Sequence, residues 1–432
     1  MPVSCKIAIA AMMILALTGC VGAVLSPTPM PPNATPFPLT VPPSATPVPP
    51  SVTPTLVASS PTAISQPSLS TKDKSAADSA EAIVKELVAA KLEAMKAKDI
   101  QRYLALINET DKEYYTEQRN WFLIYQDAVT SDFTIEVKKA EKINDTTIIA
   151  SLHQHYLYGP EKADRTVTYE ERFIKTSDGW RDADLNFSVK QTTHFVVKYP
   201  EEAEAKVTEV CEEAENAYAS VVKELGLEPR DKITLKLFAD QEMLRQSTDI
   251  RVAYLFNGWA EDGESIKMYA RRERATIAPL IAHEMTHKIT LGISDSLNSW
   301  LAEGLAIYFG SRPFRGGNAL QMGWFTVEEL SKPVTWLEEN TLIQMTDEKT
   351  ISLYNSVSAM VVEFIAKTYG RDRVKALLTE LSKYPRYNRG YDYGKMEQEN
   401  QKRLHQAIKT VLGVNMDTFN RQWLKWISLQ KG

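Results

Sequence analysis

The stretch from residue 275 to residue 291 reads ATIAPLIAHEMTHKITL. Its apolar residues recur three or four positions apart, which predicts a helix. Gly292 follows the last of them, at a position where helices commonly end. Within this predicted helix stand His283, Glu284 and His287, so the segment carries both a structural pattern and a chemical one.

The spacing of the two histidines suits a metal site. Residues four apart on a helix lie on one face, so His283 and His287 can direct their rings at one point. Zinc binds neutral imidazole nitrogen, and its catalytic sites usually keep three protein ligands and one open position. Glu284 lies beside the first histidine and can reach a water molecule at that position, which is the physical content of the H-E-x-x-H motif. A motif this short also arises by chance, so an ordinary helix without metal stays an alternative here.

A third ligand follows sixteen residues after His287. Residues 300–306 read WLAEGLA and again have helical spacing, with Asn298 or Ser299 able to cap the start of the helix. Glu303 lies in this segment and supplies a carboxylate flanked by small residues. Together these residues predict a His-His-Glu site for one catalytic Zn²⁺.

Both motifs resemble those of the gluzincin metallopeptidases, closest to the peptidase MA-like group, which pairs H-E-x-x-H with a downstream W-L-x-E-G-x-A segment. The resemblance runs from about His194 to Ile427. It implies a zinc-dependent peptidase acting on a peptide or protein, with zinc held by His283, His287 and Glu303. It also implies that Glu284 takes a proton from water and passes it to the leaving amine.

The resemblance extends to the oxyanion and to the substrate. Gluzincins stabilise the oxyanion with a Tyr or His further along the chain. Tyr354 is the candidate here, with Tyr369 and Tyr308 as weaker substitutes, and packing is the alternative role for Tyr354. An edge strand above the metal pairs with the extended substrate in this family, and either residues 257–260 or residues 266–270 would form it.

One position departs from the family pattern. Several relatives place an acid four residues after the glutamate ligand, where it orients a zinc histidine. Ile307 occupies that position in this chain. Asp295 and Asp347 are the possible replacements, on the basis of charge alone.

The amino terminus predicts a lipid anchor. Lys6 precedes an apolar run over residues 7–17, which has the length of a signal-peptide core and is too short to span a bilayer. The run ends in Leu-Thr-Gly-Cys at residues 17–20, which resembles a bacterial lipobox. We therefore expect residues 1–19 to be removed and Cys20 to be lipidated, which would anchor the protein outside the cytoplasm on the bacterial cell membrane. An ordinary signal peptide with a chance cysteine is the alternative.

The remaining chain divides into three expected segments. Residues 20–74 form a Pro/Thr/Ser-rich stalk, because residues 21–70 carry no charge and hold 14 of the 22 prolines. In residues 75–191, helical patterns give way to strands with a period of two, which indicates an α+β layer with one covered sheet face. That order resembles the small cone of the nuclear-transport-factor-2/SnoaL-like domains. Residues 192–432 would form the gluzincin domain, with a mixed sheet, an active-site helix and a helical lobe.

The remaining histidines and Cys211 are expected to have structural roles. His153 and His155 share one face of a predicted strand but lack an evident third ligand. His194 and His405 are isolated in the sequence. Cys211 lies in a helical pattern and is expected to be a buried thiol without a disulfide partner.

Composition narrows the function classes. Lys and Arg number 50 against 55 Asp and Glu, for a net charge of -5. No basic stripe is present, so a nucleic-acid partner is not expected. The alternative to an anchored peptidase is a surface binding or scaffold lipoprotein whose peptidase-like domain has lost turnover. The sequence predicts no oligomeric state.

Overall fold

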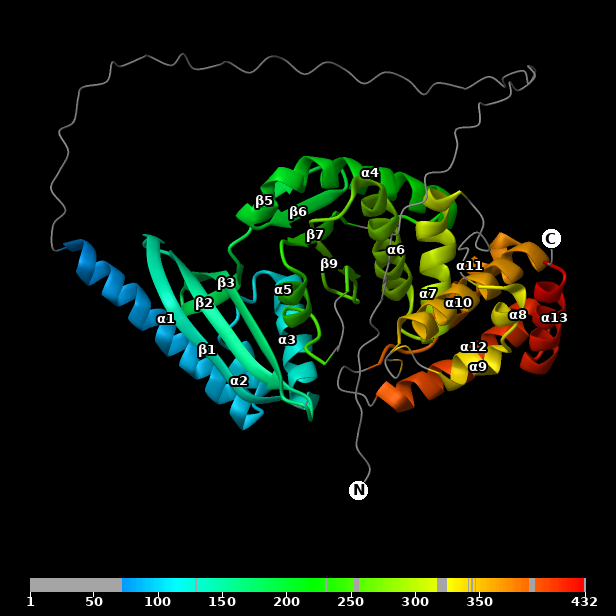
Figure 1. Cartoon of the computed structure of the whole chain (residues 1–432), viewed down its shortest axis with the longest axis horizontal. Coiled ribbons are helices and arrows are strands. Elements are labelled where there is room, and N and C mark those ends of the chain that lie inside the picture. The colour runs from blue at the N-terminus through cyan, green and yellow to red at the C-terminus, as the bar shows by residue number, and fades with distance from the viewer. Residues whose placement is uncertain are drawn as a thin grey trace, which may run out of the picture. The chain divides into compact units, whose positions relative to one another are not determined.

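The computed structural model describes residues 72–128, 130–229, 231–251, 256–316, 325–340, 342, 345, 347–387 and 393–430. The expected signal peptide, Cys20 and the expected stalk lie outside these residues. From Lys74 onward the chain belongs to one compact unit, which contains two separate sheets and many helices (Figure 1).

The first sheet is an antiparallel meander covered by helices. Its strands follow the chain order β1-β2-β3-β4. They are β1 (Thr130–Asn144), β2 (Thr147–Tyr158), β3 (Ala163–Thr176) and β4 (Gly179–Leu185), and the preceding helices are α1 (Lys72–Ala97), α2 (Ile100–Leu104) and α3 (Lys112–Asp127). Buried and half-buried residues alternate along β2, because successive side chains point to opposite faces. Val84 and Val88 of α1 pack against Ile148, Ala150 and Leu152 of that strand.

The second sheet is mixed and has the order β5-β6-β7-β9-β8. Its members are β5 (Ser188–Gln191), β6 (Phe195–Tyr199), β7 (Ile233–Phe238), β8 (Gly258–Trp259) and β9 (Ile266–Tyr269). β6, β7 and β9 run parallel, whereas β5 and β8 are antiparallel to their neighbours. Every residue of β7 is buried, as expected for a central strand covered on both faces. A mixed sheet was predicted for residues 192–432, and four of its five strands lie there, but β5 precedes residue 192. The cone shape of the amino-terminal part stays a prediction.

Helices surround the second sheet and fill the carboxy-terminal part. They are α4 (Glu204–Leu225), α5 (Gln241–Gln246), α6 (Arg274–Ile293), α7 (Ser299–Leu305), α8 (Val327–Leu330), α9 (Val334–Glu339), α10 (Glu348–Thr368), α11 (Arg371–Leu381), α12 (Tyr393–Leu412) and α13 (Met416–Ser428). Short 3-10 turns occupy η1 (Glu201–Ala203) and η3 (Arg312–Arg315), and a π-helix, η2 (Ala306–Ser311), follows α7. The stretch from α10 to α13 occupies the region where a helical lobe was predicted.

Local sequence explains where several helices begin. An Asp or Asn side chain accepts a hydrogen bond from the backbone N–H three residues later, which satisfies one of the free donors at the helix start. The residues with this role are Asp99, Asp111, Asp240, Asn298, Asp347 and Asn415.

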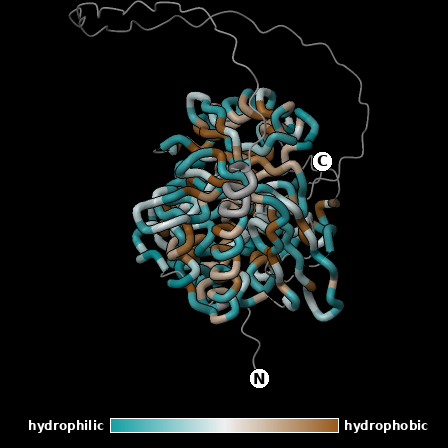
Figure 2. Tube along the Cα trace, turned by 90° about the vertical axis from the view of Figure 1, so that its left-hand side faces the viewer, coloured by the Kyte–Doolittle hydropathy of each residue, from teal (hydrophilic) through white to brown (hydrophobic). Residues whose placement is uncertain are grey.

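Hydrophobic and hydrophilic residues interleave along the elements and do not gather into one apolar band (Figure 2). Among the described residues, no helix combines the length and apolar character needed to cross a bilayer.

Candidate metal centre

Three side chains from two helices meet at one point. His283 and His287 lie on α6 and Glu303 lies on α7, and all three are buried. The Nε2 atoms of the histidines are 3.1 Å apart. Glu303 places Oε2 3.5 Å from the His283 Nε2 and Oε1 3.4 Å from the His287 Nε2. Within the described residues, this is the one group of three or more His, Cys, Asp or Glu side chains close enough to share an ion.

The separations match those of ligands around zinc. Two donors at about 2.05 Å from a tetrahedral ion lie roughly 3.3 Å from each other. The three measured separations of 3.1, 3.4 and 3.5 Å bracket that value. Within the described residues, neither oxygen of Glu303 has a hydrogen-bond partner, although the side chain is buried. A buried carboxylate without hydrogen bonds is costly unless a cation compensates it, so the donor set and its geometry fit a zinc ion.

Electrostatics favour the protonation states that bind metal. Burial lowers the pKa of His283, which keeps its ring neutral. Burial alone would raise the pKa of Glu303, but the charges and contacts of His287 and His283 outweigh it and lower the pKa to about 2. At neutral pH the site therefore offers a neutral imidazole and an ionised carboxylate, as zinc requires.

Close helix packing brings the third ligand to the other two. Asn298 caps α7 by accepting a hydrogen bond from the backbone N–H of Leu301. A Cβ at Gly304 would lie 2.5 Å from the backbone oxygen of Ser358 in α10, so only glycine fits between α7 and α10. A Cβ at Gly310 would likewise lie 2.5 Å from the backbone oxygen of Ala282 in α6. These two glycines, which both follow Glu303 in the sequence, thus allow the helices to approach closely.

Glu284 lies between the metal centre and the edge of the second sheet. It is fully buried, and neither of its carboxylate oxygens has a hydrogen-bond partner within the described part of the chain. Burial, followed by the charges of Glu303 and Glu261, raises its pKa well above the ordinary value. A Cβ on Gly258 would lie 2.6 Å from the Glu284 Oε1. The backbone of β8 therefore passes directly beside the expected base.

This arrangement decides between the two candidate edge strands. β8 contains Gly258 and Trp259 and is the last strand of the sheet, whereas β9 (Ile266–Tyr269) lies between β7 and β8. The alternative at residues 266–270 is therefore wrong, because both edges of that strand are already paired. Of the two candidates, the strand at residues 258–259 is the one at an edge of the sheet among the described strands.

Comparisons with known proteins gave matches among solved structures. No family model matches the chain, and no curated protein matches it significantly. Similar solved structures include a Glu-to-Ala variant of an M1 zinc metallopeptidase from Deinococcus radiodurans and a two-domain M1 zinc metallopeptidase variant bound to L-arginine. Each has a TM-score of 0.31 and 15% identity to this chain. Each alignment covers 68% of this chain and 61% of the other, so it spans less than two thirds of those structures.

Tyr354 lies on α10, a helix that packs against α7. It is buried, and it precedes Ser358 by one helical turn on the face of α10 that meets Gly304. Its ring packs against Trp336, with ring centroids 6.1 Å apart. These contacts show its packing, and its catalytic role stays a prediction.

The two substitutes for Tyr354 have other contacts. The Tyr369 hydroxyl donates a hydrogen bond to Gln422 in an exposed position. Tyr308 stacks against the guanidinium of Arg312, which lies 3.8 Å from the ring centroid.

The expectation that Asp295 or Asp347 orients a zinc histidine is wrong. Asp295 accepts a hydrogen bond from the backbone N–H of Tyr387, and Asp347 caps the start of α10. Within the described residues, the Nδ1 atoms of His283 and His287 have no hydrogen-bond partner. Both acids were chosen for their charge, and charge alone does not place a side chain.

The other histidines and Cys211 have structural surroundings. His153 contacts Thr168, and His155 lies 3.4 Å from Asp164. His194 pairs with Glu215, and His405 pairs with Glu338. Cys211 is buried in α4 without a disulfide, as predicted.

Sequence reasoning missed several residues around the site. Gly258 and Gly310 matter through close backbone approach, and a lone glycine in a sequence does not reveal its neighbour. Glu397 of α12 was also missed, although it accepts a hydrogen bond from the backbone N–H of Ser299 at the start of α7. Its partner lies 98 residues away in the sequence, so no local pattern indicates the contact.

Proposed function

We propose that this protein is a zinc-dependent peptidase held outside the cytoplasm by a lipid anchor. The observation that carries the proposal is the triangle of His283, His287 and Glu303, whose donor atoms are 3.1 to 3.5 Å apart and buried. Glu284 is not one of the three expected ligands. It follows His283 in the sequence and is buried as the ligands are.

The mechanism assigns each residue a separate task. Zinc at this site would supply a Lewis acid that polarises a carbonyl and lowers the pKa of water. Glu284 takes the proton from the attacking water and delivers it to the leaving amine. Tyr354 is proposed to donate a hydrogen bond to the oxyanion.

An extended peptide is the proposed substrate, because β8 offers a free strand edge. Within the described residues, β8 pairs with β9, and its Gly258 packs against Glu284. A peptide that adds to this edge would pass beside the base. Strand addition uses backbone hydrogen bonds, which every peptide can make, so the geometry supports peptide-bond hydrolysis without naming a side-chain specificity.

The location follows from the amino-terminal sequence. Lipid attached to Cys20 would anchor the chain, since two acyl chains on one residue hold a protein stably at a bilayer. The uncharged, Pro-rich segment over residues 21–70 would separate the enzyme from the membrane surface.

The test combines metal analysis with a cleavage assay. Purified protein is expected to contain about one zinc per chain and to cleave members of a peptide library, and chelation should abolish cleavage until zinc is restored. One zinc without cleavage of any peptide would favour the binding or scaffold lipoprotein over the peptidase. Absence of zinc would overturn both the metal assignment and the peptidase.

A further inference from the structure

One face of α3 contacts the second sheet and α6. Its polar side chains at positions 113, 117, 120 and 121 are spaced so that they share a helix face. Lys288, the residue after a zinc ligand, donates a hydrogen bond of 3.0 Å to Glu113. Trp121 donates a hydrogen bond of 2.7 Å to the backbone oxygen of Gln246. The amino-terminal helices are thus tied to the part of the chain that carries the metal centre.

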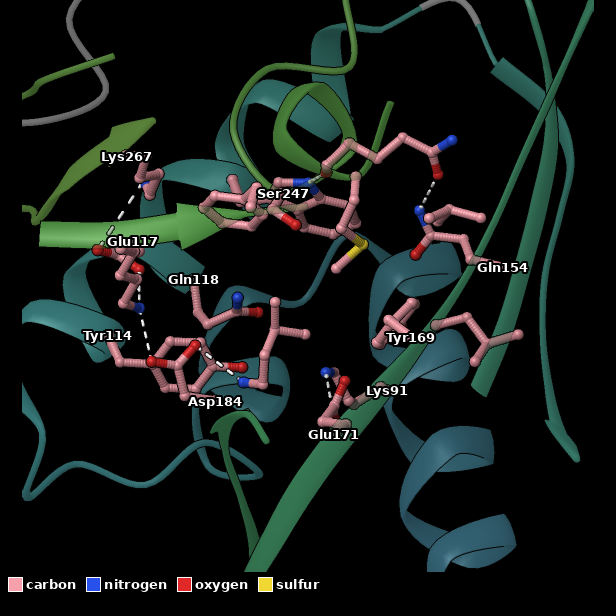
Figure 3. Close-up of a pocket in the computed structure, with 18 of the residues that line it drawn as sticks. Lys91, Tyr114, Glu117, Gln118, Gln154, Tyr169, Glu171, Asp184, Ser247 and Lys267 are labelled. Carbon is pink, nitrogen blue, oxygen red and sulfur yellow. Dashed lines mark hydrogen bonds and ion pairs between the residues drawn. The ribbon is translucent and has the colours of Figure 1, made fainter. Parts of the chain in front are cut away.

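Glu117 lies at the centre of this contact. Its Oε1 accepts hydrogen bonds from both the backbone N–H, at 3.0 Å, and the hydroxyl of Ser265. Its Oε2 accepts a hydrogen bond of 2.6 Å from Lys236 of β7. The Nζ atom of Lys267 in β9 lies 4.0 Å from Oε1. Glu117 and Lys267 line a cavity of about 70 Å³, and Figure 3 shows them at one side of it.

Burial and charge strengthen the hydrogen bonds and ion pairs in the cluster, which consists of Glu117, Lys236, Ser265 and Lys267. All four side chains are buried, and bonds to ionised groups in such surroundings are stronger than neutral ones. Burial alone would raise the pKa of Glu117, but the charges of Lys236 and Lys267 lower it to about 2. Glu117 is therefore an ionised acceptor at neutral pH.

Two paired strands, β9 and β8, connect Glu117 to Glu284, the expected base. Ser265 immediately precedes β9, and Lys267 within β9 pairs with Trp259 of β8. The backbone N–H of Tyr269 also donates a hydrogen bond of 2.9 Å to the backbone oxygen of Asn257. Because β8 has two residues and β9 is its one partner among the described strands, its position depends on where β9 begins.

We propose that Glu117 is a positioning residue for substrate binding. It holds the first residues of β9, and β9 holds the β8 edge beside Glu284 on which an extended peptide would lie. This inference rests on the proposed peptidase function. It makes the amino-terminal region a part of the substrate-binding structure and gives that region a task other than recruitment of a separate partner.

Two variants test the proposal. Glu117→Gln removes the charge, whereas Ser265→Ala removes one hydrogen bond and leaves every ionised group paired. The matched control is Glu136→Gln, which makes the same change at an exposed ion pair with Lys138 on β1. Amide hydrogen exchange of residues 257–269 is measured first, because it needs no substrate. Exchange there is expected to accelerate about tenfold in both variants and to stay unchanged in the control.

Kinetics then separate positioning from general destabilisation. For a longer peptide that can run along β8, KM is expected to rise about tenfold, whereas kcat on a dipeptide reporter and the zinc content should not change. A role confined to overall stability would instead affect both substrates alike.

Unchanged exchange in residues 257–269 in both variants would overturn the proposal. Loss of zinc in Ser265→Ala would also contradict it, because the proposed effect is on the strand and not on the metal. If the wild-type chain cleaves nothing, the peptidase function fails, and the exchange measurement still decides whether Glu117 positions β8.

Discussion

Replacing Glu397 with glutamine should stabilise the protein, and only at high pH. Glu397 is buried on α12, and its Oε1 accepts a hydrogen bond of 3.0 Å from the backbone N–H of Ser299. Burial raises the pKa of Glu397 to about 7 and is helped by the charge of Glu338, although the bonds from Ser299 oppose the shift. The contact supports the start of α7, the helix that carries Glu303.

The sign of the effect follows from which state holds the proton. The ordinary pKa of a glutamate is 4.5, so between about pH 4.5 and pH 7 the folded chain keeps a proton that the unfolded chain loses. The proton held by Glu397 therefore stabilises the folded chain. This stabilisation is complete below pH 4.5 and is lost as the pH rises through 7. The difference between the two pKa values corresponds to roughly 3 kcal/mol in the free energy of unfolding.

Glu397→Gln should remove this pH dependence, because glutamine keeps an acceptor for Ser299 and carries no charge. From pH 5 to pH 8, the stability of the variant relative to wild type should grow by roughly 2.5 kcal/mol. Chemical denaturation at both pH values measures this difference. Glu399→Gln, an exposed position on the same helix, is the control. A difference of equal size at both pH values would refute the raised pKa of Glu397.

Three further predictions concern the anchor, the metal and the oxyanion. Cys20→Ser should move the protein from the membrane fraction to the soluble extracytoplasmic fraction, and retention in the membrane would contradict the lipobox. His287→Ala should lower zinc content, measured by elemental analysis, and also the unfolding temperature, because metal binding is linked to folding. Unchanged zinc content would place the site elsewhere. Tyr354→Phe should reduce turnover about 10²–10³-fold with zinc retained, whereas normal turnover would leave Tyr354 with a packing role only.

Elements with a long, regular pattern could be predicted from the sequence. The active-site helix was expected over residues 275–291 and spans Arg274–Ile293. β8 could not be chosen in advance, because a strand of two residues has no periodicity. The π-helix η2 is set by packing of Gly310 against α6, which no local pattern expresses.

At the site, too, features with a local sequence pattern were predicted and features set by tertiary packing were not. The zinc ligands were predicted because their spacing within and between helices is itself the signal. Glu117 and Glu397 were missed because their partners lie 148 and 98 residues away. Asp295 and Asp347 were chosen by charge, and backbone hydrogen bonds hold both of them elsewhere. Residue type and spacing therefore reveal the ligands, whereas the groups that support them depend on tertiary contacts.

Zinc content and turnover measured together in Glu284→Gln test the central claim most directly. Glutamine keeps the size of the side chain but cannot accept the proton, so the variant should hold about one zinc per chain. Its turnover should fall 10²–10⁴-fold or more. Glu303→Gln is the comparison, and it should lose zinc affinity and turnover together, because it weakens a ligand. Wild-type turnover in Glu284→Gln would contradict the assignment of Glu284 as the base and, with it, the proposed mechanism.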